Sequence, residues 1–308
     1  MGRLSNLRVV DPVLTNLAIG YTNADMVCDV LFPIVPVDKE GGKIPKFTKE
    51  AFKLYNTERA LRARSNRINP EDIGSVDVIL DEHDLEYPID YRESDEAAFP
   101  LEAHATNVVT EGIRLRCEKA CADIAQNTAN YGAGNKIVLA GTSRFTDKAN
   151  SDPIGVFEDG KEAVRGKIGR YPNTAVIGAA SWKAIKQHPQ FIERIKYSMK
   201  GVLTVELLKE ILEIENIAIG RSVFSNDLGT FGDLWGDNIV LAYVAPNRSG
   251  AERTPYEPSF GYTLRKKGMP QIDKRTEDGK LELVRNTDVF RPYLLGADSG
   301  YLIADTNA

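Results

Sequence analysis

The chain has 308 residues, of which 42% are hydrophobic, 27% charged and 8% aromatic, and its net charge at pH 7 is −5. This composition excludes an intrinsically disordered chain, and the length fits one large domain or two of medium size. The slightly acidic balance excludes a protein whose whole surface binds nucleic acid or anionic lipid, so any basic surface must be local.

Only three cysteines occur, at positions 28, 117 and 121, which is too few for a disulfide framework. The first residues contain no apolar signal segment, and no stretch of eighteen apolar residues appears anywhere. The sequence therefore predicts a soluble protein of a reducing cytoplasm that makes no contact with a membrane.

Residues 1–40 have the pattern of an extended arm. Pro33 and Pro36 each push the preceding residue towards extended backbone geometry. The apolar side chains from Val30 to Val35 need another surface to pack against. That surface belongs either to the rest of the same chain or to a neighbouring copy, and the sequence leaves both possibilities open.

Two consecutive segments carry opposite charge. Between Lys43 and Arg67 the net charge is +6, whereas between Glu71 and Glu102 it is −11. A charge run is usually a solvated face, and coincidence or a hairpin within the chain would also explain the pair. The residues singled out in the basic loop (residues 43–67) are Lys43, Lys46, Lys49, Lys53, Arg59, Arg62, Arg64 and Arg67. Those singled out on the acidic surface (residues 77–96) are Asp77, Asp81, Glu82, Asp84, Glu86, Asp90, Glu93, Asp95 and Glu96.

The acidic segment alternates apolar and polar residues in two stretches, 76–80 and 85–91, which predicts two strand segments with a bulge or bend near His83. The longest helical pattern follows over residues 101–130, with apolar positions at Leu101, Ala105 and Val108 and no proline. Thirty residues would make a rod of about 45 Å, which is long for a chain of this size.

Residues 171–263 predict a separate α/β unit. A buried strand over 173–178 is followed by a helix over 181–198 and by a second helix that Thr204 caps. The last segment, residues 264–308, predicts further strands joined by turns.

No motif points to catalysis, a nucleotide or a metal. The glycine-rich stretches at 132–136 and 160–167 lack the hydroxyl residue of a phosphate-binding loop. His83, His104 and His188 are scattered, without the spacing of zinc ligands. Cys117 and Cys121 share one face of the long helix, and we interpret them as small core residues rather than ligands. We therefore expect no catalytic, cofactor or metal residues.

The order of these parts resembles the major capsid protein of tailed double-stranded DNA bacteriophages. Its fold is named after phage Hong Kong 97 (HK97-like) and is shared by encapsulin nanocompartments. Local stretches that resemble the family are DPVLTNLAIGY, LFPIVPV, VIGAASWKAIKQHPQF, TVELLKEILEIENIAIGRSVF and GADSGYLI.

The resemblance implies an α+β fold with four parts. Residues 1–40 would form the N-terminal arm, and residues 41–76 an extended hairpin called the E-loop. Residues 77–170 and 264–308 would form the peripheral P-domain, with its spine helix over 101–130. Residues 171–263 would form the axial α/β A-domain.

The resemblance also implies a structural protein, not an enzyme, that assembles into pentamers and hexamers of an icosahedral shell around packaged DNA. In this family the E-loop lies over the P-domain of an adjacent subunit, so we expect the basic loop of one copy to dock on the acidic surface of the next. An encapsulin-like shell protein and a cytosolic α/β enzyme with an unrecognised site are the alternatives.

The resemblance further implies partners and a location. We expect a separate scaffolding protein, a portal and a decoration protein, and non-specific contact with packaged DNA. Candidates for that contact are Arg3, Arg8, Lys266 and Lys267. The expected location is the virion, after synthesis and assembly in the cytoplasm of the host bacterium.

Overall fold

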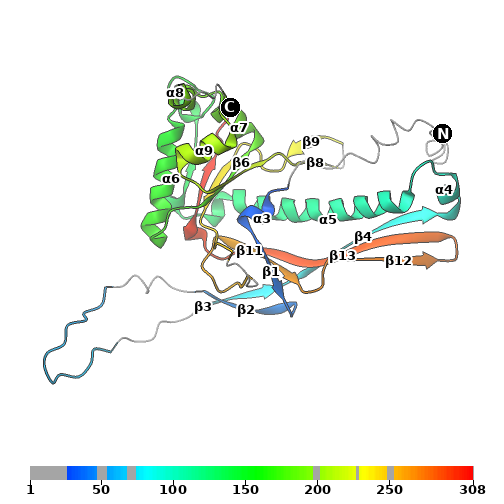
Figure 1. The fold of residues 1–308 in the computed structure, drawn as a ribbon, viewed down its shortest axis with the longest axis horizontal. Helices are drawn as coiled ribbons and strands as arrows, with labels where there is room; N and C mark the ends of the chain where they lie inside the picture. Colours follow the sequence, from blue (N-terminus) through cyan, green and yellow to red (C-terminus); the bar gives the residue numbers. More distant parts are fainter. Residues whose placement is uncertain are drawn as a thin grey trace.

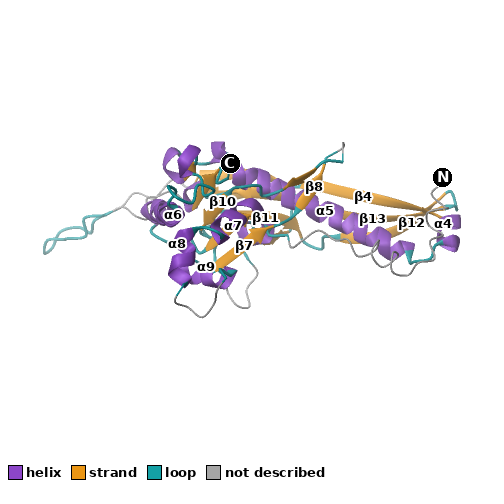
Figure 2. Ribbon diagram, turned by 90° about the horizontal axis from the view of Figure 1, so that it is seen from above, coloured by secondary structure: helices purple, strands orange, loops and turns teal. Residues whose placement is uncertain are grey.

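A computed structural model describes residues 26–46, 54–67, 74–196, 202–226, 229–247 and 253–307. An α/β body lies near the middle of the molecule, and a long helix with a strand ribbon extends from it in one direction (Figure 1). A hairpin projects from the same region in the opposite direction. The view from above shows the same elongated outline (Figure 2).

The first sheet has five strands, and its central strand is β13 (Leu281–Leu294). Along part of its length β13 pairs antiparallel with both β4 (Asp81–Asp90) and β12 (Gln271–Glu277). Its remaining part pairs antiparallel with β11 (Gly261–Lys266), and β1 (Ile34–Val37) joins the sheet parallel to β11. Chain segments far apart in sequence therefore build the ribbon that carries the acidic strand.

The long helix α5 (Leu101–Gln126) lies along β4 and β13. Its buried side chains recur at every fourth position, including Leu101, Ala105, Val109 and Cys121. Since four residues advance slightly more than one turn, this row winds round the helix, so its beginning faces the ribbon and its end faces the α/β body. The predicted stripe was wrong at Val108, whose side chain is exposed.

The predicted helix over 101–130 was four residues too long. The α-helix ends at Gln126, and a separate 3-10 helix follows from Thr128 to Asn130. The Asn127 side chain accepts a hydrogen bond from the backbone N–H of Ala129 at 2.9 Å. Asn is favoured where a helix starts, because its side chain satisfies a free backbone donor there.

The second sheet has five strands in the order β5, β14, β10, β6, β7. Their bounds are Lys136–Val138, Gly300–Ala304, Ile239–Ala242, Thr174–Gly178 and Asn216–Gly220. Three of these strands come from the predicted unit 171–263, whereas β5 and β14 lie outside it. The sheet therefore extends beyond the predicted limits of that unit in both directions.

Among the described residues, four helices pack against this sheet and form with it the largest apolar cluster, which includes Phe157, Ile177, Leu208 and Ile303. They are α6 (Pro153–Ile168), α7 (Ala179–Lys186), α8 (Pro189–Ile195) and α9 (Val205–Leu212). The helix predicted over 181–198 was wrong, because α7 and α8 are separate helices. Proline lacks an N–H and its ring clashes with the preceding turn, so Pro189 starts a new helix.

Shorter elements complete the fold. They are α3 (Cys28–Leu31), α4 (Tyr91–Glu96), the hairpin of β2 (Gly41–Lys46) and β3 (Gly74–Ile79), and the hairpin of β8 (Val223–Ser225) and β9 (Phe231–Asp233). The bend predicted near His83 lies instead at Leu80, between the end of β3 and the start of β4. The buried face changes there because β3 pairs with β2 whereas β4 pairs with β13.

The described part of the N-terminal arm packs on its own chain. Leu31, Phe32 and Val35 are fully buried, and β1 continues the first sheet. Of the two surfaces left open by the sequence, residues 28–37 therefore use that of the same chain. The arm also contains one turn of helix, α3, before its extended strand.

Candidate subunit interface

The base of the predicted E-loop is the two-stranded hairpin β2–β3. Lys43 faces Asp77 across this hairpin, and the lysine Nζ lies 3.5 Å from a carboxylate oxygen. Both side chains are largely exposed, so the pair adds little stability. Part of the opposite charge seen in the sequence is thus paired inside one chain. Lys46 ends β2, and Lys49 and Lys53 lie outside the described residues.

The far part of the hairpin, residues 54–67, is exposed throughout. Its turn closes where the Ala63 N–H donates to the Ala60 carbonyl, and the Arg59 guanidinium donates to the Ala63 carbonyl at 2.6 Å. The Asn66 side chain donates to two carbonyls of the facing segment. These contacts shape the segment locally, and its guanidinium groups at positions 59, 62, 64 and 67 are all exposed.

Two leucines in this segment are nearly or completely exposed. Leu54 is 100% exposed and Leu61 is 90% exposed. Burying a leucine side chain is favourable by about 1.5–3 kcal/mol, so this segment has apolar surface that another surface could cover. Within the described residues the body of the same chain does not cover it.

The acidic surface is partly neutralised by its own sheet. Asp81 pairs with Arg291 at 3.5 Å and Glu86 with Arg275 at 3.0 Å. Asp84 accepts a hydrogen bond from the Thr287 hydroxyl at 3.2 Å. Because Arg291 of the neighbouring strand β13 and Arg275 of the next strand β12 pair with acids of β4, the charge of β4 is less concentrated than the sequence indicates.

Most of the remaining acidic side chains lie where β4 ends and α4 begins. Asp90 is the N-cap of α4, and its carboxylate accepts from the backbone N–H of Arg92 at 2.9 Å. Glu93, Asp95 and Glu96 follow on α4, and Glu82 lies near the start of β4. Glu82, Asp95 and Glu96 are exposed, so their carboxylates face solvent.

The far part of the basic loop and the α4 end of the acidic surface lie at opposite ends of the molecule. Residues 54–67 are at one end of the longest axis, while the far end of β4 and α4 are at the other (Figure 1). Only the bases of the two regions meet in one chain, where Lys43 pairs with Asp77. A contact between residues 54–67 and α4 requires two copies.

The N-terminal arm, the long helix and the α/β body are joined by a buried carboxylate that the sequence did not reveal. Glu118 of α5 is fully buried and accepts hydrogen bonds from the backbone N–H groups of Val27, at 3.0 Å, and Cys28, at 2.8 Å. It also accepts from Trp235 Nε1 at 2.6 Å. Burial raises the pKa of Glu118 to about 7. Glu118 follows Cys117 directly in the sequence, on the buried side of the helix. That position was the only indication in the sequence that Glu118 is buried.

The two lysines predicted to contact DNA are paired within the chain. Lys266 forms an ion pair with Glu40, and Lys267 forms one with Asp38 at 3.2 Å. Arg3 and Arg8 lie outside the described residues. The helices of the described residues include none that is both long and apolar enough to cross a membrane.

The three histidines have separate structural roles. His83 stacks on the ring of Phe290, and His104 meets the ring of Phe99 edge to face. His188 is the N-cap of α8, where its Nδ1 accepts from a backbone N–H, and its Nε2 lies 3.1 Å from the Ser151 hydroxyl. The structure brings no two of them together.

The cysteines, in contrast, do come together. Cys117 and Cys121 are buried, which confirms that they are core residues. Cys28, which is about ninety residues away along the chain, belongs to the same apolar cluster. The sequence did not indicate this third member.

Comparison with known proteins places the fold and the family. A family model described as phage major capsid protein E matches residues 28–306. A curated major capsid protein of Burkholderia phage BcepMu is 67% identical over 307 residues, which cover 100% of both chains. The crystal structure of a phage-related protein from Bordetella bronchiseptica RB50 has 36% identity and a TM-score of 0.76, and covers 97% of this chain and 98% of that one.

A more distant structure shows the fold alone. A chain of the mature capsid of bacteriophage PhiM1 has 10% identity and a TM-score of 0.55, over 94% of this chain and 89% of that one. The predicted α+β, HK97-like capsid fold is thereby confirmed. Because the family model spans nearly the whole chain and the BcepMu protein matches it from end to end, the chain belongs to the phage major capsid protein E family.

Proposed function

We propose that this capsid protein assembles into the pentamers and hexamers of an icosahedral shell that encloses the double-stranded DNA of a tailed phage. The shell is its location in the virion, and assembly takes place in the cytoplasm of the host. In this role the chain performs no catalysis. The observation that carries the proposal is the exposed hairpin, which places charged and apolar side chains far from the body of its own chain.

The parts of the chain have distinct roles in this assembly. Residues 1–40 are the N-terminal arm, 41–76 the E-loop, 77–170 with 264–308 the P-domain, and 171–263 the A-domain. The sheet that combines β5 and β14 with the A-domain strands supports a rigid connection between the A-domain and the P-domain. A rigid subunit fixes the angle at which neighbours meet.

The basic loop of one copy docks on the acidic surface of the next. Two observations support this contact: the surfaces have opposite net charge, and residues 54–67 lie at the opposite end of the molecule from α4. The exposed Leu54 and Leu61 add apolar area to the loop. Exposed ion pairs are worth only about 0–1 kcal/mol each, so the charges set register and salt sensitivity more than strength.

Other partners follow from the role of a shell protein. A separate scaffolding protein directs assembly, a portal occupies one vertex and a decoration protein binds the outside. Contact with packaged DNA is non-specific. Since Lys266 and Lys267 already pair with acids of the same chain, Arg3 and Arg8 are the better candidates for that contact.

Electron microscopy of the purified chain, alone and with its scaffolding protein, tests the proposal. The expected product is a closed particle of megadalton mass. Reversing the charge of Arg59, Arg62 and Arg64 to glutamate should leave a soluble, folded subunit that no longer forms shells. Normal shells from this triple variant at low ionic strength, where charges are least screened, would refute the docking contact.

A charge exchange provides the matched control. Glu82→Lys, Asp84→Lys and Asp95→Lys together should also prevent assembly. Combined with the reversed loop, they should restore shells, because the two surfaces again have opposite sign. If each set of substitutions prevents assembly and the combined variant assembles, unfolding of the subunit alone cannot explain the result.

A further inference from the structure

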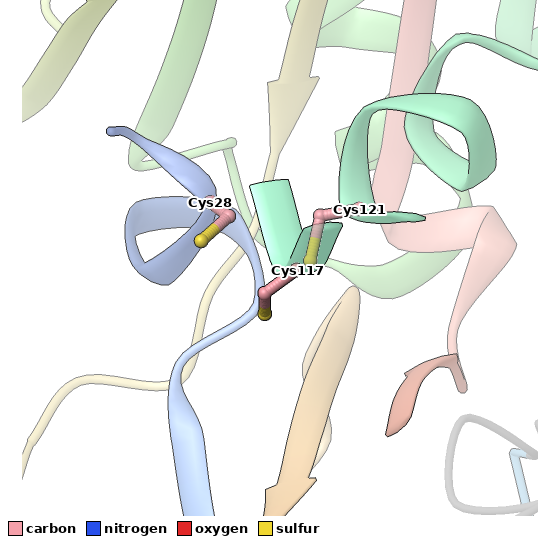
Figure 3. Close-up of side chains that lie close together, drawn as sticks. All are labelled: Cys28, Cys117 and Cys121. Carbon is pink, nitrogen blue, oxygen red and sulfur yellow. The ribbon is translucent and has the colours of Figure 1, made fainter. Parts of the chain in front are cut away.

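The three thiols of the chain form one buried cluster. Their sulfur atoms all lie within 4.8 Å of one another. Cys28 begins α3, whereas Cys117 and Cys121 are one turn apart on α5 (Figure 3). The side chains of Cys28 and Cys117 are about 6% exposed and that of Cys121 is fully buried. These are all the cysteines of the sequence, and in the structure all three are free thiols.

The fold holds the cluster in place from two sides. Spacing of four residues puts Cys117 and Cys121 on one face of α5. Cys28 is fixed at the start of α3 because its backbone N–H donates to the buried Glu118 carboxylate at 2.8 Å. Apolar side chains, including Leu31 and Ile113, belong to the same buried cluster as the thiols. The backbones of α3 and α5 therefore bring the sulfur atoms together.

Thiolates are soft ligands that select Cu(I), Zn²⁺ and iron–sulfur clusters. Structural zinc sites and iron–sulfur clusters take four protein ligands. Within the described residues no histidine or carboxylate joins the three sulfurs at the same mutual distance. The Asp29 carboxylate accepts from the Cys28 thiol at 3.6 Å but is not within that distance of all three sulfurs. The Thr263 hydroxyl lies 3.8 Å from Cys121 Sγ as a hydrogen-bond partner. Three buried sulfurs therefore fit an ion that accepts three-coordinate sulfur geometry, and Cu(I) is such an ion.

We propose that Cys28, Cys117 and Cys121 form a binding site for one soft metal ion, Cu(I), with three sulfur ligands. On binding, each coordinating thiol loses its proton to solvent and the ion stays monovalent, so no oxidant or reductant is needed. The bound ion would tie the N-terminal arm to the long helix. This inference does not depend on the proposed assembly, because it concerns the interior of one subunit.

The test is a titration of the full-length protein with Cu(I) in the absence of oxygen and in competition with a Cu(I)-specific chelator. The wild-type protein should retain one Cu(I) per chain and show the ultraviolet charge-transfer absorption of copper–thiolate bonds. Cys28→Ser keeps the backbone donor to Glu118 but removes one sulfur. This variant should bind Cu(I) at least about 100-fold more weakly. Loss of a residue that only supports a metal ligand already lowers metal affinity by up to about 100-fold, and loss of a ligand should cost no less.

Val27→Ala is the matched control, because it alters a neighbouring buried side chain of the arm without removing a thiol. It should retain the ion, and circular dichroism should show both variants folded. X-ray absorption of the copper-loaded wild-type protein gives a measurement that needs no variant, with three sulfur neighbours as the expected result. Three results would each overturn the proposal. The first is that the wild-type protein retains no copper while all three thiols are reduced. The second is that Cys28→Ser binds copper as well as the wild-type protein does. The third is a disulfide between two of the cysteines.

Discussion

Replacing Glu118 by alanine would leave three buried donors without their acceptor: the backbone N–H groups of Val27 and Cys28 and the indole N–H of Trp235. A buried donor without a partner costs about 1–3 kcal/mol, so the three together should lower the free energy of unfolding by about 3–9 kcal/mol. That is a large share of the 5–15 kcal/mol, roughly, that stabilises a typical domain. We therefore expect Glu118→Ala to be severely destabilised.

The same residue should make stability depend on pH. Burial raises the pKa of Glu118 from 4.5 to about 7 in the folded state, so the folded protein binds this proton more tightly than the unfolded chain. Stability should accordingly be highest below the unfolded-state pKa and fall as the pH rises towards about 7, by about 3 kcal/mol in total. Above about pH 7 the contribution of Glu118 to the free energy of unfolding should stay constant.

Urea unfolding of the full-length subunit, followed by tryptophan fluorescence between about pH 4 and 8, measures both effects. Glu118→Gln should remove the pH dependence, since an amide does not titrate in this range. Glu111→Ala is the control on the same helix, because Glu111 is partly exposed and pairs with Arg114 rather than with buried donors. A loss below about 1 kcal/mol for Glu118→Ala would refute the role of Glu118 as the shared acceptor.

Three further substitutions have expected outcomes. Phe32→Ala leaves a cavity at a fully buried position of the arm and should lower the free energy of unfolding in urea by about 3–5 kcal/mol. A loss below about 1 kcal/mol would argue against an arm that packs on its own chain. Gly220→Ala places a methyl group against the Trp235 ring and should cost about 1–3 kcal/mol by overpacking, seen as a lower thermal midpoint. Lys43→Ala removes only the exposed pair with Asp77 and should change the free energy of unfolding by less than about 1 kcal/mol, so a larger loss would show that this pair is more than a surface contact.

Local patterns in the sequence determined the type and order of most elements. Uninterrupted helical periodicity predicted α5, and Thr204 marked the start of α9, where its side chain does cap the helix. The segment 181–198 does not follow its local pattern, because it forms two helices rather than one. Its apolar positions continue through Pro189, but the proline ring ends one helix and begins another.

The charge pattern gave an incomplete account of the surfaces. The segregation of basic and acidic residues is a property of the sequence, yet Asp81 and Glu86 have cationic partners on β12 and β13, some two hundred residues away. The pairing of strands decides which charges neutralise one another. Sequence proximity therefore overestimated how concentrated the acidic surface is.

What the sequence determined by itself is the set of elements, the capsid-type order of its parts and the separation of charge between them. The tertiary structure alone decided the meeting of Cys28 with Cys117 and Cys121, the three N–H donors that converge on Glu118, and the entry of β5 and β14 into the A-domain sheet. The physical reason is that periodicity and capping act over a few residues, whereas these contacts join segments about a hundred residues apart that the chain path brings together.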